Sequence, residues 1–308
     1  MLLSLPGNCS GKKGHASPQC SIAVVSRDKG AYVPICDLAA VRKLAQGGHV
    51  YEQNQLGIAS VLAISPDLDT QTAVGWFTKS AENGYAPAQV NLGVVYANGW
   101  GVGRNYATAL YWFHRAAEQQ YPRAYYNLGI LYLEGSGVRQ DYAEALRYFR
   151  MGAAAGDTSA ETNLGYMYDE GLGVTRDPRA AVGWYEKAAG QGEALAENNL
   201  ADMYLRGIGV AQDDVKALHW FQLAAEQGSA AASIKLGYML AEGRGCHKDI
   251  EVGYQWVLAG TLAGDHRGED LLHSLAQELT QEQRARTEKV VQERRENPEL
   301  RLSASLER

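Results

Sequence analysis

Small and apolar residues recur along this chain with a period of 36 residues, and within each period they follow the spacing of an α-helix. In residues 86–97, Ala88, Leu92 and Tyr96 stand four residues apart and form one stripe of a helix. The apolar face of a second helix follows at the same spacing, through Ala109, Trp112, Phe113 and Ala116. Each period is therefore predicted to fold as a pair of helices.

The same columns of residues recur in phase over five or six copies, without an insertion. A leucine followed by glycine or alanine stands at Leu56, Leu92, Leu128, Leu164, Leu200 and Leu236. A bulky aromatic residue, which we assign to the core, stands at Trp76, Trp112, Tyr148, Trp184, Trp220 and Trp256. Because one helix pair cannot bury its apolar surface alone, the pattern predicts an all-α fold. We expect a right-handed α/α superhelical solenoid of about six 36-residue helix-turn-helix repeats with helical caps.

Turn and cap residues mark where the helices end and begin. Paired glycines close each first helix, since glycine accepts the positive φ of a C-cap, at Gly99/Gly101, Gly135/Gly137, Gly171/Gly173, Gly207/Gly209 and Gly243/Gly245. A side chain suited to an N-cap then precedes each second helix, at Asp69, Asn105, Asp141, Asp177, Asp213 and Asp249. Gln120 stands where other copies carry glycine, at the turn after the second helix.

The register also predicts the boundaries of the chain's parts. Residues 1–36 lack the period and are expected to be an irregular extension, and 37–48 align with a second helix that caps the first repeat. The solenoid covers 49–275, and 276–308 form a charged C-terminal capping helix and tail. Thr280 and Gln283 have the spacing of a capping box, which opens a helix near 281–295.

Composition and charge exclude several classes of protein. The 308 residues are 46% apolar and 21% charged, too apolar for a disordered chain. The net charge of −6 lacks the basic footprint of a nucleic-acid-binding protein, and most of the negative charge falls on residues 37–275, which carry −9. No run of apolar residues is long enough to span a membrane. The apolar run at the start is too short for a signal peptide, so we expect a cytoplasmic location by default, with a periplasmic or secreted location as the alternative.

The repeat unit resembles the Sel1-like repeat (SLR) family, relatives of the tetratricopeptide repeats. One unit carries the matching residues Ala124, Leu128-Gly129, Tyr132, Gly135, Gly137, Asp141, Ala145, Tyr148, Gly152-Ala153 and Gly156. The resemblance implies a non-catalytic scaffold or adaptor that holds other proteins and needs no cofactor. Many bacterial members are exported, and a cysteine-rich subgroup binds β-lactam compounds. The cysteines of this chain do not recur with the period, unlike those of that subgroup.

Candidate catalytic and metal-binding residues are few. The chain has no GxSxG, HExxH, CxxC or Walker-type motif, and no inserted loop to carry a catalytic site. His266, Asp270 and His273 have the spacing of one helix face, which fits either a divalent metal or a solvated cap, and we assign no metal site. Cys246 stands in a column of valines, which indicates a small buried residue.

The candidate partner-binding residues are those that vary against the constant repeat. Trp100 lies between two turn glycines, where it is either an interface residue or a cover for its neighbouring turn. The varying faces of the first helices and an asparagine column supply the other candidates: Tyr126, Asn163, Tyr166, Asp169, Asn198, Asn199, Asp202 and Tyr238. The asparagines at 91, 127, 163 and 199 fit a grip on a ligand backbone or a structural hydrogen bond equally well.

These residues predict a scaffold or adaptor that binds a protein or peptide with basic and apolar residues in the concave groove of the solenoid. One alternative is an exported envelope or secreted protein in which two of Cys9, Cys20 and Cys36 form a disulfide. The other is a hydrolase of the β-lactam-binding subgroup, which would need a catalytic constellation in the groove.

Overall fold

The computed structural model describes residues 38–62 and 68–296 of the chain. The extension 1–36, with Cys9, Cys20 and Cys36, lies outside the described residues. Within them every regular element is a helix, as the sequence predicts. The chain divides into two compact units, with the boundary between Ala160 and Glu161.

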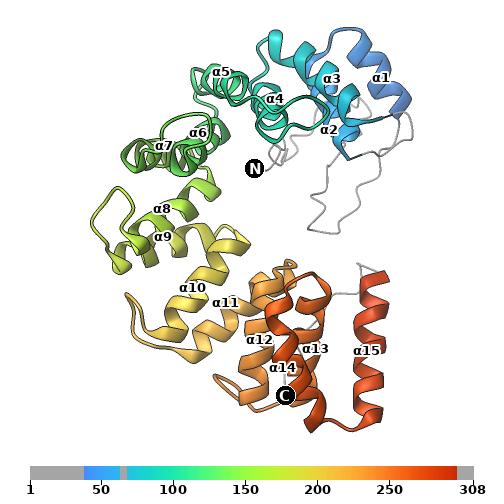
Figure 1. Ribbon diagram of the computed structural model, residues 1–308, viewed down its shortest axis with the longest axis vertical. Coiled ribbons are helices and arrows are strands. Elements are labelled where there is room, and N and C mark those ends of the chain that lie inside the picture. Colours follow the sequence, from blue (N-terminus) through green and yellow to red (C-terminus); the bar gives the residue numbers. More distant parts are fainter. Residues whose placement is uncertain (1–37, 63–67, 297–308) are drawn as a thin grey trace, which may run out of the picture. The chain divides into compact units, whose positions relative to one another are not determined.

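The first unit is built from a series of α-helices (Figure 1). Its helices are α1 (Leu38–Gln46), α2 (Val50–Val61), α3 (Thr70–Glu82), α4 (Ala86–Asn98), α5 (Tyr106–Ala117), α6 (Pro122–Glu134) and α7 (Tyr142–Ala154). The first helix of each repeat packs on the second, α2 on α3, α4 on α5 and α6 on α7. Helix α8 (Thr158–Glu170) begins in this unit and continues into the next.

The second unit continues the same pattern and ends in a different arrangement. It contains α9 (Pro178–Ala189), α10 (Ala194–Arg206), α11 (Asp214–Glu226), α12 (Ala230–Glu242), α13 (Ile250–Leu262), a 3₁₀ turn η1 (His266–Gly268), α14 (Glu269–Glu278) and α15 (Gln281–Glu296). Helix α15 packs on α13. Its start is the expected capping box, because Thr280 N–H donates to Gln283 Oε1 at 2.9 Å and Gln283 N–H donates to Thr280 Oγ1 at 3.2 Å.

The helix ends follow the turn chemistry of the sequence. The side chains of all six predicted N-cap residues accept hydrogen bonds from the first turn of α3, α5, α7, α9, α11 and α13. In the glycine pairs, the first glycine has positive φ, as at Gly99 (75°). The second lies against the preceding second helix: a Cβ on Gly101 would be 2.5 Å from the carbonyl of Thr70, the first residue of α3.

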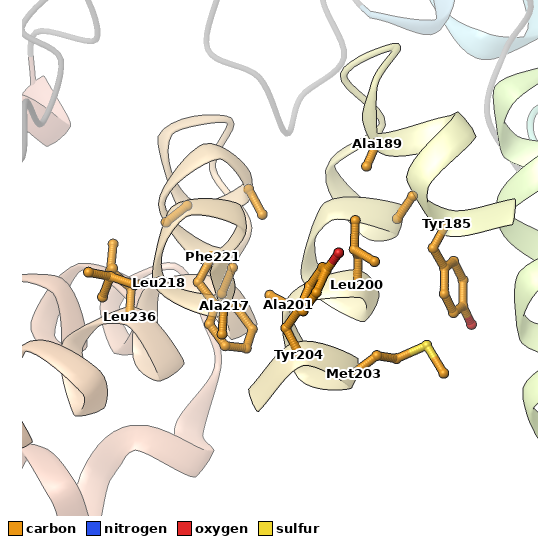
Figure 2. Packing of buried hydrophobic residues seen from close by; sticks show 14 of the residues in the cluster. Tyr185, Ala189, Leu200, Ala201, Met203, Tyr204, Ala217, Leu218, Phe221 and Leu236 are labelled. Carbon is orange, nitrogen blue, oxygen red and sulfur yellow. The ribbon is translucent and has the colours of Figure 1, made fainter. Parts of the chain in front are cut away.

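In most repeats the aromatic ring that fills the core belongs to the residue directly after the aromatic column that the sequence assigns to the core. Tyr148 and Trp256 of this column are buried, at 8% and 2% exposed, whereas Trp76, Trp112, Trp184 and Trp220 are only half-buried, so the assignment of the column to the core is wrong for these four residues. The fully buried rings belong to the following residues, Phe77, Phe113, Phe149, Tyr185 and Phe221. Figure 2 shows the buried cluster of the second unit, which contains Tyr185 of α9, Leu200 and Ala201 of α10 and Phe221 of α11.

In four repeats the glycine that follows the column leucine makes room for the buried ring, whereas Phe221 is buried in the repeat in which Ala201 takes this place. A Cβ on Gly93 would lie 2.5 Å from Cε1 of Phe113, and one on Gly129 would lie 2.6 Å from Cε1 of Phe149. The missing side chain opens a recess in the first helix, and the ring from the second helix fills it. Trp76, Trp112 and Trp220 pack against the buried clusters from their edges. Lys79 Nζ lies 4.6 Å from the ring centre of Trp76.

Candidate functional site

Three residues at equivalent positions of successive repeats lie along the first helices of the second unit. They are Tyr166 on α8, Asp202 on α10 and Tyr238 on α12, and we call them the tyrosine row. Tyr166 is 43% exposed and Tyr238 is 39% exposed, although large apolar side chains elsewhere in these helices are mostly buried. An exposed tyrosine offers a large apolar ring and a hydroxyl with little conformational entropy to lose.

A polar group occupies the middle of the tyrosine row. Lys235 of α12 forms an ion pair with Asp202 of α10, and each side chain is 32% exposed. Lys235 Nζ also donates to Asn198 Oδ1 at 3.3 Å, and Asn198 is itself 8% exposed. The row therefore presents two aromatic side chains with a bridged, half-exposed ion pair between them.

Lys235 is a functional candidate that our reading of the sequence missed. It stands 36 residues after Asn199, in the column that carries asparagine in four earlier repeats. This change from asparagine to lysine is the feature of the sequence that could have identified Lys235 as a candidate. Its partner Asp202 lies on a different helix, so only the structure joins the two.

Tyr238, the last residue of the tyrosine row, forms a hydrogen bond with an arginine. Arg244 hydrogen-bonds Tyr238 and donates two hydrogen bonds to the carboxylate of Asp214, at 3.0 and 2.8 Å. The guanidinium lowers the pKa of Asp214 below its ordinary value, mainly through these hydrogen bonds. Arg244 occupies the place between two turn glycines that Trp100 occupies in its own repeat.

The remaining candidates of the second unit have partners within the chain. Asp169 accepts from Arg176 Nη2 at 3.3 Å. Asn199 hydrogen-bonds Tyr185, whose burial raises its pKa above the ordinary value. Asn199 thus contacts a core ring of α9, which favours a structural role for it, and Asn163 is half-buried on α8.

The other two candidates, Trp100 and Tyr126, lie in the first unit. Trp100 is half-buried and packs against two buried clusters, the one around Phe77 and the one around Phe113. This packing favours its role as a cover for the neighbouring turn. Tyr126 is half-buried, with its ring centre 6.2 Å from that of Phe149 and the guanidinium of Arg123 5.0 Å away.

The asparagine column is engaged in structural hydrogen bonds in the first unit. Asn91 and Asn127 are fully buried. Asn91 Nδ2 donates to Asn54 Oδ1 at 2.9 Å, from α4 to α2, and Asn127 Nδ2 donates to the carbonyl of Arg123 at 2.8 Å. Of the two interpretations of this column, the structural one is favoured there.

The described residues hold no group of three His, Cys, Asp or Glu side chains arranged for a metal ion. His266 Nδ1 lies 2.7 Å from Glu269 Oε1. His273 Nε2 lies 3.0 Å from Gln277 Nε2 on α14, whereas His266 lies in the 3₁₀ turn η1, so the two histidines contact different neighbours and do not share one helix. Cys246 is half-buried, and burial raises the pKa of its thiol. Among residues 38–62 and 68–296 no helix has the length and apolarity to cross a membrane.

Fold and surface together define an α-helical repeat protein. The Sel1 repeat model matches residues 61–85, 86–121, 122–157, 158–193, 194–229 and 230–265, so the chain belongs to the Sel1 repeat family. Proteins of this family generally mediate protein–protein interaction, and their fold is typically a non-catalytic scaffold. The resemblance seen in the sequence is thereby confirmed.

Solved structures show the same fold. A Sel1 repeat protein from Oxalobacter formigenes is 32% identical with a TM-score of 0.63, over 72% of this chain and 93% of that one. An immunity protein from Pseudomonas aeruginosa is 20% identical with a TM-score of 0.52, over 69% of this chain and 82% of that one, and shares the fold alone. No curated protein matches the sequence.

Proposed function

We propose that this protein is a non-catalytic interaction scaffold whose second unit binds a partner protein over the tyrosine row. The observation that carries the proposal is the pair of exposed rings, Tyr166 and Tyr238, at equivalent positions two repeats apart. Aromatic side chains that are free to be desolvated are the usual anchors of protein interfaces. The ion pair of Asp202 and Lys235 between them supplies the polar contacts that fix orientation.

The charge of the second unit favours a partner with basic residues. Residues 161–296 carry 22 acidic and 14 basic side chains, a net charge of −8 with histidine neutral. The two acidic candidates of this surface, Asp169 and Asp202, are each paired with a cation of the chain. The preference for a basic partner therefore comes from long-range attraction, which speeds association, and less from a free carboxylate at the contact.

Site-specific photocrosslinking in the cells that make the protein tests the location of the interface. A benzophenone amino acid replaces Tyr166, Tyr238 or, as a control of the same residue type, Tyr111, which is 53% exposed on α5. We expect one protein adduct from both positions of the tyrosine row and none from position 111.

Two matched variants complete the experiment. Tyr166→Ala with Tyr238→Ala should abolish capture of the same protein by an affinity-tagged chain while helical circular dichroism is unchanged, whereas Tyr111→Ala should capture it normally. Equal adducts from all three positions, or full capture by the double variant, would contradict the proposal.

A further inference from the structure

Helix α15 is attached to the second unit by few buried side chains. Two of its sixteen residues, Thr287 and Val291, are buried, whereas α12 buries seven of its thirteen. Helices in proteins gain most of their stability from packing of an apolar face against their neighbours. Helix α15 therefore has much less apolar burial to hold it in place than a helix of the repeats has.

The apolar core at this end of the chain is built by other helices. The buried cluster there consists of Ala241 of α12, Tyr254 and Val257 of α13, Leu275 of α14 and Leu279. The outer face of α14 is already polar, as the last layer of a solenoid needs for contact with water. Its exposed residues are Glu269, Asp270, His273, Ser274 and Gln277. Helix α14 thus closes the repeats, and α15 is added to a finished core.

The contacts that join α15 to α13 are polar. Arg286 forms an ion pair with Glu251, but its side chain is 67% exposed, and ion pairs at such exposed positions contribute little. Tyr254 donates a hydrogen bond to Glu288 Oε1 at 3.0 Å. A hydrogen bond that water can replace contributes a modest net stabilisation, so these two contacts hold α15 weakly.

Two arginines on the inner face of α15 oppose the attachment. Arg284, Thr287, Val291 and Arg294 stand three or four residues apart and share one face of the helix. Nε of Arg284 and Nη1 of Arg294 are buried and have no hydrogen-bond partner among the described residues. Burial lowers the pKa of Arg294, yet a guanidinium stays charged in a protein. The lost hydration of these groups is therefore regained when α15 leaves the surface.

We propose that α15 is a releasable lid on α13, which lifts as one unit while the repeats stay folded. The hinge lies at Thr280, which is exposed, because Leu279 before it is anchored in the buried cluster. Release uncovers the Tyr254 hydroxyl and the Glu251 carboxylate and returns the inner arginines to water. The lid lies outside the tyrosine row, so this inference is independent of the proposed interface.

Hydrogen–deuterium exchange of the full chain, followed by mass spectrometry at neutral pH, tests the release. A lone helix of sixteen residues is marginal in water, so α15 should lose its amide protection each time it lifts. We expect amides across 285–293 to exchange together, at least about 100-fold faster than those of α12 and α13. Protection equal to that of α12, or protection that declines steadily toward residue 296 as in fraying, would overturn the proposal.

Matched variants test the physical cause. Arg294→Leu replaces an unpaired buried charge with an apolar side chain, so exchange in α15 should slow about tenfold, whereas Arg295→Leu, at the exposed neighbour, should leave it unchanged. Unchanged or faster exchange in Arg294→Leu would contradict the proposal.

A third variant separates release of the lid from unfolding of the unit. Tyr254→Phe removes the hydrogen bond to Glu288, so exchange in α15 should become about tenfold faster while exchange in α12 stays the same. Equal acceleration in α12 and α15 would show that α15 opens only with the whole unit, which would also overturn the proposal. Helical circular dichroism equal to that of the parent chain verifies that each variant is folded.

Discussion

At the scale of the residue, packing between the two helices of four repeats depends on a glycine in the first helix. Gly93 faces the ring of Phe113, and Gly57 faces that of Phe77, at distances where a methyl group has no room. Glycine inside a helix costs about 0.5–1 kcal/mol relative to alanine. That cost is offset here because the recess lets a phenylalanine ring reach full burial, which stabilises by about 1.5–3 kcal/mol.

Gly93→Ala and Gly75→Ala should therefore have opposite effects. The new methyl of Gly93→Ala lies within 2.5 Å of the Phe113 ring, so we expect the free energy of unfolding to fall by about 1–3 kcal/mol. Gly75 is an exposed residue of α3 with nothing within 4 Å of the new methyl, so Gly75→Ala should raise it by about 0.5–1 kcal/mol. Urea denaturation measures both, and similar shifts for the two variants would contradict the packing described.

Gln120 carries the one strained backbone conformation of a non-glycine residue within the described residues. Its φ is 57°, at a turn where Gly84, Gly156, Gly192, Gly228 and Gly264 stand in other repeats. Left-handed backbone costs a residue with a Cβ about 1–2 kcal/mol, and glycine removes the penalty. Gln120→Gly should therefore raise the free energy of unfolding by about 1 kcal/mol, measured by urea denaturation. A loss of stability would show that the Gln120 side chain makes a stabilising contact.

At the scale of the element, the last helix is joined to the repeats by a polar contact at a buried ring. Tyr254 of α13 is 4% exposed and donates a hydrogen bond to Glu288 Oε1 of α15 at 3.0 Å. Burial, and then the hydrogen bond to Glu288, raise the pKa of Tyr254 to about 12. Arg286 of α15 also pairs with Glu251 of α13, so two contacts bind the same two helices.

The raised pKa predicts how stability changes in alkali. A folded-state pKa above the unfolded value means that this tyrosine stabilises the fold fully below pH 10, and that the contribution is lost as pH rises from 10 to about 12. In Tyr254→Phe the urea midpoint should therefore fall less steeply over this window than in the parent chain. Tyr111→Phe, at an exposed position, is the control, and parallel curves for all three proteins would refute the assignment.

At the scale of the whole molecule, residues 86–265 consist of five consecutive repeats of equal length. Residues 86–121 and 122–157 each match one full repeat, and neither contains an insertion. Tyr85 and Tyr121 stand at equivalent positions, each as the N-cap of a first helix. Such a repeat contacts only its neighbours, so stability is close to a sum over repeats and their interfaces.

Removal of one full repeat should therefore leave a folded protein. Deleting 86–121 joins Tyr85 to Pro122 in register, and we expect unchanged helical ellipticity per residue with a lower urea midpoint. Deleting only 104–121 removes α5 and leaves the apolar face of α4 without its partner helix. That variant should lose helicity or aggregate, and equal folding of the two deletions would contradict the repeat as the unit of stability.

The sequence by itself determined the helices, their ends and the family of this protein. These features depend on local chemistry, because an Asp that caps a helix and a Gly that ends one act on backbone groups a few residues away. The period then places equivalent residues at equivalent positions, which puts Tyr166, Asp202 and Tyr238 at the same place on the first helices of three successive repeats.

Only the tertiary structure decided which aromatic residues are buried and which polar residues contact one another across helices. Phe113 is buried in preference to Trp112 because Gly93, twenty residues earlier on a neighbouring helix, makes room for its ring. Asp202 joins Lys235, and Asn199 joins Tyr185, through contacts that span separate helices. Periodicity fixes the face of a helix on which a side chain stands, but its partner depends on the helix packed against that face.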